Sequence, residues 1–135
     1  FRFDLIDWYL MGDQRGLSRA FLNVLDNAAK WSPQGGTVTM VMQQVDDELV
    51  EVTVDDEGPG IPPEERELVF ERFYRAVESR AMPGSGLGLA IVKQVMESHG
   101  GSVRAEASPS GGTRMVLELP GGPRLHADSD QPDEL

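Results

Sequence analysis

The sequence contains no cysteine and only two histidines among its 135 residues. Without cysteine it can form no disulfide and bind no metal through thiolates, which fits a reducing compartment without proving one. Acidic residues outnumber basic ones 23 to 12, for a formal net charge of −11. Because nucleic-acid phosphates are bound through lysine and arginine, this balance argues against nucleic acid as the main partner. Any anion must therefore be bound by a local group of residues.

Long apolar runs are also missing. No stretch is long enough to cross a bilayer, and there is no signal-peptide pattern. The composition, 39% apolar and 26% charged, is that of a globular domain, and 135 residues suffice for one core with little room for a second. The chain opens on Phe1-Arg2-Phe3 and not on methionine, which suggests a piece of a longer protein.

Periodicity predicts five strands and three helices. The strands are expected at residues 2–11, 37–45, 49–55, 102–107 and 113–119. One helix is expected from an N-cap at Asp13 to Trp31, a second from Pro63, and a third from within residues 86–89 to His99, ended by Gly100. Apolar residues of the second helix are Leu68, Val69, Phe70 and Phe73.

Short turns at residues 46–48 and 108–112 join neighbouring strands into hairpins. This order of elements predicts an α+β two-layer sandwich, with a mixed, mostly antiparallel sheet of five strands and three helices on one face. The acidic segment 121–135 has almost nothing to bury and is expected to be disordered. The folded domain is therefore expected to span residues 1–120.

The first helix carries polar side chains that suit a metal-nucleotide site. At about 100° per residue, Asn23, Asn27 and Lys30 fall within about 60° of one another. A carboxamide offers an oxygen to Mg²⁺ and an NH₂ group to phosphate, and lysine binds phosphate as a point charge. The side expected to pack carries Phe21, Leu22, Leu25, Ala28 and Ala29. An ordinary amphipathic helix with a solvated polar side shows the same pattern.

A glycine-rich turn follows the third predicted strand, with the sequence Asp56-Glu57-Gly58-Pro59-Gly60. A partly buried carboxylate at a strand end is suited to an amino group such as the exocyclic amine of adenine, because it only accepts hydrogen bonds. The glycines would let a ligand approach the backbone closely. The alternative is a turn that binds nothing, since this composition is common in turns.

The segment Gly84-Ser85-Gly86-Leu87-Gly88-Leu89 leads into the third helix, whose N-terminal N–H groups and dipole favour phosphate. No strand precedes it, so it does not match a Rossmann fingerprint. We expect a loop hinged on these glycines that folds over a triphosphate, with a flexible connector as the alternative. Shortly before it, Arg72 and Arg75 can reach phosphate or pair with nearby glutamates, the commoner fate of surface arginines.

These motifs together resemble the N, G1, F and G2 boxes of two-component sensor histidine kinases, in the same order and spacing over residues 13–120. The four motifs are Asn23-x-x-x-Asn27 with Lys30-Trp31, Asp56-x-Gly58-x-Gly60, Phe70-Glu71-Arg72-Phe73 and Gly84-x-Gly86-x-Gly88. In detail the sequence is most similar to the MprB-type kinases of actinobacteria. The resemblance implies the Bergerat ATP-binding fold shared with gyrase, Hsp90 and MutL, and ATP with Mg²⁺ as cofactors.

At the phosphate end, the resemblance implies that Asn27 is the Mg²⁺ ligand and that Asn23 lies beside the metal and the phosphates. Lys30 would contact phosphate, and Arg72 or Arg75 would meet the γ-phosphate. ATP-hydrolysing relatives carry a glutamate at the position of Asn23, where it activates water as a general base. Because an amide cannot take a proton at neutral pH, the resemblance points to phosphoryl transfer and not to hydrolysis.

At the base end, the resemblance implies that Asp56 accepts a hydrogen bond from the adenine amine. Trp31, where the family usually has tyrosine, would flank the adenine or the ribose. Further residues implied for the base pocket are Gly58, Gly60, Ile61 and Thr113. The hinge and anchor of the lid over ATP would be Gly84, Gly86, Leu87, Gly88 and Leu89.

Neither histidine of the chain is expected to accept phosphate. His99 ends the third helix, where a cation suits the helix C-terminus, and His126 lies in the acidic tail. The resemblance therefore implies an acceptor histidine on a separate dimerisation domain, with relay to an aspartate of a response regulator. It also implies a cytoplasmic domain of an inner-membrane sensor protein, monomeric when isolated. Two alternatives remain open: a serine kinase of the anti-sigma type, and a regulatory module that has lost nucleotide binding.

Overall fold

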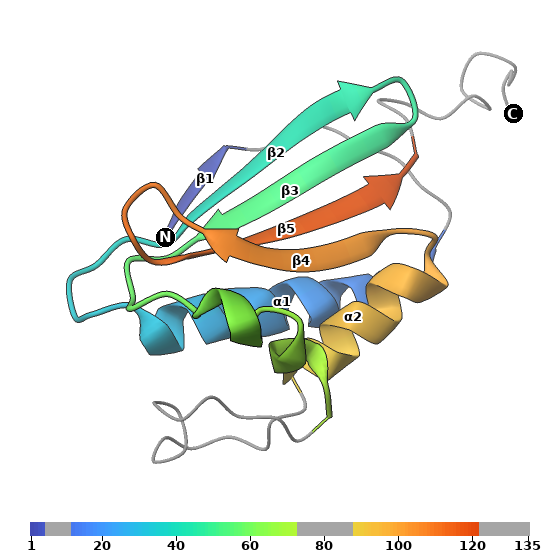
Figure 1. Cartoon of the computed structure of the whole chain (residues 1–135). Helices are drawn as coiled ribbons and strands as arrows, with labels where there is room; N and C mark the ends of the chain where they lie inside the picture. The colour runs from blue at the N-terminus through green and yellow to red at the C-terminus, as the bar shows by residue number, and fades with distance from the viewer. Residues whose placement is uncertain (5–11, 73–87, 122–135) are drawn as a thin grey trace, which may run out of the picture.

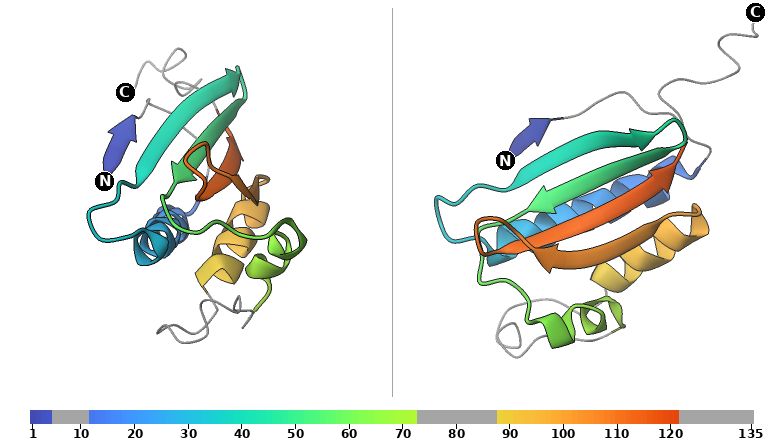
Figure 2. Two further views of the ribbon diagram at one scale, coloured as in Figure 1. Left: turned by 60° about the vertical axis from the view of Figure 1, so that its left-hand side comes forward. Right: turned by 45° about the horizontal axis from the view of Figure 1, so that its top comes forward.

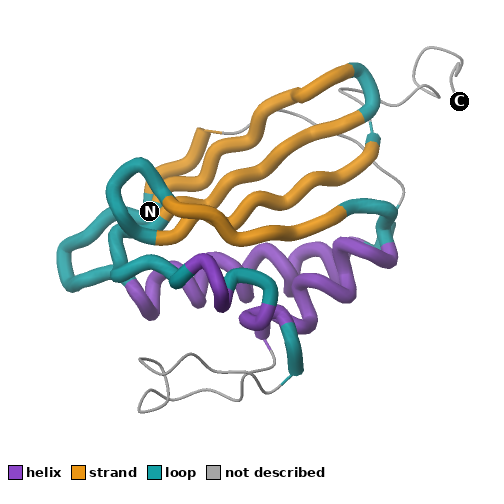
Figure 3. Tube along the Cα trace, in the orientation of Figure 1, coloured by secondary structure: helices purple, strands orange, loops and turns teal. Residues whose placement is uncertain are grey.

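The computed structural model describes residues 1–4, 12–72 and 88–121. Within these ranges the chain forms two layers, a five-stranded sheet and a layer of helices packed against one of its faces (Figure 1). Colouring by secondary structure shows the same division, with strands in one layer and helical segments in the other (Figure 3). The predicted α+β two-layer sandwich is confirmed.

The sheet contains β1 (Arg2–Asp4), β2 (Thr39–Asp46), β3 (Leu49–Asp55), β4 (Ser102–Ala107) and β5 (Thr113–Pro120). The strand order is β1-β2-β3-β5-β4, with β1 parallel to β2 and all other pairs antiparallel. The sheet is therefore mixed and mostly antiparallel, as predicted. Of the strand predicted at residues 2–11, the structure describes residues 2–4 as a strand, and residues 5–11 lie outside the described residues.

The two long helices begin and end close to the predicted positions. Helix α1 (Gln14–Trp31) has Asp13 as its N-cap, whose side chain accepts a hydrogen bond from the N–H of Arg15. Helix α2 (Gly88–Ser98) is followed by Gly100, with φ of 77°. The N–H of Gly100 donates to Glu97 and that of Gly101 to Met96, which is the Schellman pattern for ending a helix at glycine.

The second predicted helix is instead a pair of 3₁₀ turns, η1 (Pro63–Glu65) and η2 (Leu68–Phe70). A segment this short gains few α-helical hydrogen bonds for the cost of nucleation, and short connectors commonly take the 3₁₀ form. Phe70, one of the apolar residues of that predicted helix, is buried in the core, with 6% of its surface exposed. Phe73 lies outside the described residues.

The core lies between the sheet and the helices. From α1, Ala20, Val24 and Ala28 are buried, which shows that small side chains spaced four residues apart let this helix approach the sheet. The strands contribute alternate residues, since successive side chains of a strand point to opposite faces. Other buried core residues are Val38, Met40, Val50, Val52, Val54, Val69, Val92, Met96, Ala105, Met115, Leu117 and Leu119.

The predicted packing side of α1 was wrong for Leu22 and Ala29. Leu22 is 59% exposed, and Ala29 is exposed as well. The buried stripe is centred on Val24, and Leu22 lies about 160° from it around the helix. Phe21 and Leu25, also predicted to pack, do lie partly buried against the core.

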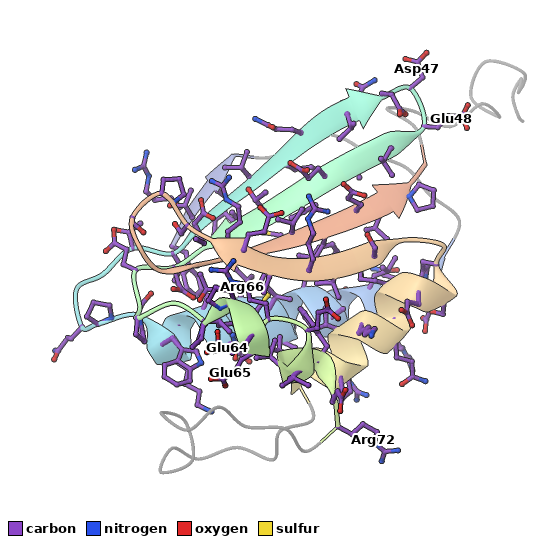
Figure 4. All side chains as sticks on the ribbon, in the orientation of Figure 1. Asp47, Glu48, Glu64, Glu65, Arg66 and Arg72 are labelled. Atoms are coloured by element: carbon purple, nitrogen blue, oxygen red, sulfur yellow. The ribbon has the colours of Figure 1, made fainter. Side chains whose placement is uncertain are left out.

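The other face of the sheet is polar and carries two sets of ion pairs. Arg104 contacts Glu51, Glu106 and Glu118, at 3.9, 2.6 and 3.4 Å. Arg114 binds the carboxylate of Asp55 through two nitrogens. The acidic β2–β3 turn with Asp47 and Glu48 lies at the opposite end of the sheet from η1 (Figure 4).

His99 joins the end of α2 to the start of α1. Its Nδ1 lies 2.8 Å from the carbonyl oxygen of Val95, and its Nε2 accepts the backbone N–H of Asp13 at 2.9 Å. Because a carbonyl only accepts and an N–H only donates, these contacts require a neutral imidazole protonated at Nδ1. The expectation of a cation at this helix end was wrong, because the ring accepts a hydrogen bond from another helix.

Candidate functional site

The loop after β3 passes directly over the C-terminal end of α1. A Cβ atom at Gly58 would lie 2.7 Å from the carbonyl oxygen of Trp31, so only glycine allows this close approach. Glu57 fastens the loop, since its N–H donates to Oγ of Ser32 at 3.2 Å and its Oε1 accepts the N–H of Thr37 at 3.0 Å. Trp31 and the Asp56 loop are therefore neighbours, as the predicted site requires.

Asp56 is a buried carboxylate whose two oxygens have different surroundings. The residue is 3% exposed, and its Oδ1 accepts the backbone N–H groups of Gly58 and Thr113 at 2.9 and 3.0 Å. Within the described part of the chain, Oδ2 has no hydrogen-bond partner. Since buried polar atoms are nearly always paired, Oδ2 is an acceptor available to a ligand.

Burial raises the pKa of Asp56 above its ordinary value, and the negative charge of Asp55 adds to the rise. The N–H groups of Thr113 and Gly58 act in the opposite direction, because they stabilise the carboxylate. Asp55 itself is held by Arg114, with Nε 2.7 Å from Oδ1 and a terminal nitrogen 2.8 Å from Oδ2. That pairing partly compensates the charge next to Asp56.

The β4–β5 turn frames the other side of Asp56. A Cβ at Gly112 would overlap the backbone carbonyl of Asp56 and lie 2.7 Å from its Oδ1. Oγ of Ser110 donates to the same carbonyl at 3.2 Å. Gly60 has φ of 82°, and a Cβ there would lie 3.0 Å from the carbonyl oxygen of Gly111. The two glycine-containing turns therefore pack backbone to backbone around the carboxylate.

The other end of the predicted site lies where α1 passes the start of α2. Nδ2 of Asn23 donates to the carbonyl of Gly88 at 3.4 Å, which is a long hydrogen bond. Asn27 and Lys30 are partly exposed on the same stripe of α1, one and two turns towards Trp31. Leu89 packs partly buried against the core. The structure therefore brings Asn23 to the start of α2, and leaves Asn27 and Lys30 accessible.

Several predicted residues are placed differently or lie outside the described residues. Arg72 is exposed, and its side chain points away from the body of the domain in Figure 4. Ile61 is partly buried, and its carbonyl accepts Nε of Arg66 at 3.1 Å. Four predicted residues lie outside the described residues: Arg75, Gly84, Gly86 and Leu87. The same holds for His126.

Three residues that hold the two loops in place, Ser32, Glu57 and Ser110, were not predicted from the sequence. Their contacts join positions 20 to 54 residues apart, so no local pattern marks them. Only the pair Gly111-Gly112 before Thr113 gave a signal, because glycine pairs often mark close backbone approach.

The predicted phosphate end of the site consists of two neutral amides, Asn23 and Asn27, and one lysine, Lys30. Among the described residues it contains no cluster of carboxylates. Across residues 1–4, 12–72 and 88–121, no group of three or more histidine, aspartate or glutamate side chains is arranged to hold a metal ion. A cation at this end would therefore need most of its oxygen ligands from elsewhere. In the same ranges, no helix combines the length and the apolar character needed to span a membrane.

Known proteins resemble this chain over most of its length. The profile of the family described as histidine kinase-, DNA gyrase B-, and HSP90-like ATPase matches residues 12–123. The signal transduction histidine-protein kinase/phosphatase MprB of Mycobacterium avium (strain 104) is 55% identical over 136 residues, covering 98% of this chain and 26% of that protein. The chain thus spans about a quarter of the length of this relative.

Two solved structures have the same fold. A mycobacterial sensor histidine kinase MprB superposes with a TM-score of 0.84 at 53% identity, covering 91% of this chain and 85% of the other. Full-length ShkA in complex with AMPPNP superposes with a TM-score of 0.76 at 28% identity, covering 90% of this chain and 25% of the other. The chain belongs to the family of histidine kinase-, DNA gyrase B- and HSP90-like ATPases.

Proposed function

We propose that this domain binds Mg·ATP and donates the γ-phosphate to a histidine on a separate dimerisation domain of a two-component sensor kinase. The observation that carries the proposal is the arrangement along α1. Trp31, at the C-terminal end of the helix, meets the Asp56 loop, and Asn23, near the middle of the helix, meets the start of α2. The step of eight positions from Asn23 to Trp31 rises about 12 Å along the helix, which separates a base site from a phosphate site.

At the base end, Oδ2 of Asp56 accepts the exocyclic amine of adenine. The carboxylate is already fixed by two backbone N–H groups, so binding costs little further ordering. Trp31 lies against Gly58 and flanks the base or the ribose. Gly60, Ile61 and Thr113 complete the pocket around the carboxylate.

At the phosphate end, Asn27 and Asn23 offer amide oxygens and NH₂ groups, and Lys30 offers a positive charge. This donor set fits a Mg²⁺ ion that keeps phosphate oxygens and water as its other ligands, since Mg²⁺ is rarely held by an all-protein cage. When bound, Mg²⁺ neutralises charge on the phosphates. The lid residues Gly84, Gly86, Leu87, Gly88 and Leu89, and Arg72 or Arg75, are proposed to close over the triphosphate.

Transfer is favoured over hydrolysis because the residue one turn before Asn27 is Asn23. Its amide donates to the carbonyl of Gly88 and has no basic group with which to activate water. Catalysis then rests on holding the γ-phosphate in line with a protein nucleophile and on neutralising its charge. The names of the relatives, which are histidine kinases, support a histidine as that nucleophile.

The proposal extends to the setting of the domain in a longer protein. Residues 1–120 form the catalytic domain, residues 121–135 form a tail outside it, and the domain is monomeric by itself. The acceptor domain lies in the same full-length kinase, and a response regulator takes the phosphate from the histidine. We place this domain on the cytoplasmic side of an inner-membrane sensor protein. A serine kinase and a module without nucleotide binding are not favoured by any contact in the site.

The experiment titrates the protein with ATP in the presence and absence of Mg²⁺, and then supplies an acceptor domain with radiolabelled ATP. We expect Mg²⁺-dependent binding and an acid-labile phosphoprotein, because phosphohistidine is destroyed by acid and phosphoserine is not. Asn27→Ala should abolish transfer without loss of fold by circular dichroism. The matched control is Gln44→Ala, which removes an exposed amide from β2. Full activity of Asn27→Ala, or acid-stable labelling, would refute the proposal.

A further inference from the structure

A second polar stripe runs along α1, on the side opposite the core. Arg15, Arg19, Leu22 and Asp26 are all exposed, and about 100° per residue places them within about 60° of one another. The stripe lies on the far side of the helix from the buried residue Val24. The ribbon views show α2 and the 3₁₀ turns along one flank of α1, and no described segment over the far side (Figure 2).

Side chains of this stripe border an open depression of about 620 Å³. Its lining residues are Gln14, Arg15, Ser18, Arg19, Leu22, Asn23 and Asp26. Leu22, with 59% of its surface exposed, is the only large apolar side chain among them. The depression therefore has an apolar contact point surrounded by polar groups, which is the composition of a small interface centre.

The two arginines have no structural task that the described residues reveal. Neither Arg15 nor Arg19 forms an ion pair with an acidic side chain in the described ranges. Arg15 also lies in the first turn of α1, where the positive end of the helix dipole disfavours a cation. In a chain of net charge −11, two neighbouring arginines without an ion pair among the described residues form a local positive site. Their charge is thus available to an acidic partner.

The stripe is continuous with the proposed phosphate end of the site. Asn23 both lines the depression and donates to Gly88 at the start of α2. A partner that covers Leu22 would therefore lie next to the position proposed for the γ-phosphate. Asp26 lies at the other end of the stripe from Arg15, so one end of the surface is acidic and the other is basic. This arrangement favours one orientation of a partner, with its basic groups at Asp26 and its acidic groups at the arginines.

We propose that this stripe docks an acidic amphipathic helix of the domain that carries the phosphate acceptor, with an apolar residue over Leu22 and carboxylates at Arg15 and Arg19. The inference rests on the proposed function for the identity of the partner. Docking at this surface orients the acceptor towards the phosphate end of α1, and opposite charges select the partner and speed its association.

The test measures docking and catalysis separately. The probe is the segment of MprB from Mycobacterium avium that directly precedes the part matched by this chain. We compare the wild type, the charge-reversed variant Arg15→Glu/Arg19→Glu, Leu22→Ser, and a control Arg2→Glu/Lys93→Glu with the same change in net charge at other exposed sites. Each protein is assayed for affinity for the segment, for affinity for ATP and for the rate of transfer to the segment.

We expect the charge-reversed variant to bind the segment and to transfer phosphate at least tenfold more weakly, with ATP affinity within twofold of the wild type. Leu22→Ser should lose several-fold in segment affinity, and the control should lose less than twofold. Salt should weaken segment binding by the wild type more than binding by the charge-reversed variant.

Two results would overturn the inference: no binding of the segment by the wild type, or equal losses in the charge-reversed variant and the control. Failure of the proposed function is a different result, because it would show as absent ATP binding in the wild type while segment affinity still depends on Arg15 and Arg19.

Discussion

Replacing Asp56 with asparagine should separate the nucleotide role of this side chain from its role in the fold. The asparagine oxygen can keep the two hydrogen bonds that Oδ1 accepts from Gly58 and Thr113. Its NH₂ group then takes the place of Oδ2. A donor would thus face the adenine amine, which is itself a donor.

The expected loss of ATP affinity follows from the charged hydrogen bond that disappears. Such a bond contributes about 1.5–3 kcal/mol, which corresponds to a loss of roughly 10- to 150-fold in affinity. GTP should lose less or gain, because guanine carries a carbonyl oxygen where adenine carries the amine, and an NH₂ group can donate to it. The measurement is calorimetric titration with both nucleotides in Mg²⁺.

Whereas Asp56→Asn should bind ATP more weakly, its folded state should be no less stable than that of the wild type. Burial raises the pKa of Asp56 in the folded state, so the folded protein loses stability as the pH rises through that raised pKa. At pH 7 the wild type carries this cost and Asp56→Asn does not, so the variant should be equally stable or more stable. The difference should vanish below about pH 4, the ordinary pKa of aspartate, where both side chains are neutral. Urea unfolding at several pH values measures it.

Asp55→Asn is the matched control, because it makes the same chemical change one residue earlier. It breaks the two-pronged contact with Arg114, a partly exposed pair, and should lower stability by up to about 1 kcal/mol. ATP affinity should change less than threefold. Unchanged ATP affinity in Asp56→Asn would refute the assignment of Oδ2 as the adenine acceptor. A larger loss of stability there than in Asp55→Asn would contradict the stated cost of burying the Asp56 charge.

Three further predictions concern backbone contacts. Gly112→Ala should lower stability by about 1–3 kcal/mol and weaken ATP binding, because its Cβ would overlap Asp56, whereas Gly88→Ala has open space for a Cβ and should keep its stability in urea unfolding. His99→Ala should cost about 1 kcal/mol and speed amide exchange at Asp13, since the ring accepts that N–H; unchanged exchange would contradict the tautomer. Ser110→Ala should weaken ATP binding less than threefold, because a single bond to the Asp56 carbonyl is lost, and a larger loss would show that Ser110 itself meets the nucleotide.

The sequence predicted most of the fold because its signals were local. Strand β3 has the predicted bounds, since alternating valines and the acidic turn at residues 46–48 mark it on both sides. The helix ends at Asp13 and Gly100 were found because capping chemistry depends on residue type at one position. The 3₁₀ turns were missed because apolar spacing of three fits either kind of helix over a short segment.

The errors on α1 and at His99 have another origin. The side of a helix that is buried depends on which residues the sheet packs against. Here the sheet packs against the side that carries Ala20, Val24 and Ala28, so Leu22 on the other side remains exposed. The protonation state of His99 depends on Asp13, 86 residues away in the chain. Contacts of this kind depend on how distant segments pack, so residues close in the sequence do not predict them.

Asp55 and Asp56 are adjacent and have identical side chains, but they have different roles in the protein. Successive residues of an extended chain point to opposite faces, so one carboxylate lies among the arginines of the polar face and the other points into the molecule. The first is neutralised by Arg114 and serves the fold. The second is buried with one oxygen unpaired among the described residues, and above its pKa this has a cost in stability that a bound donor relieves. Ligand binding and folding should therefore be linked at this residue, with ATP stabilising the wild type more than Asp56→Asn.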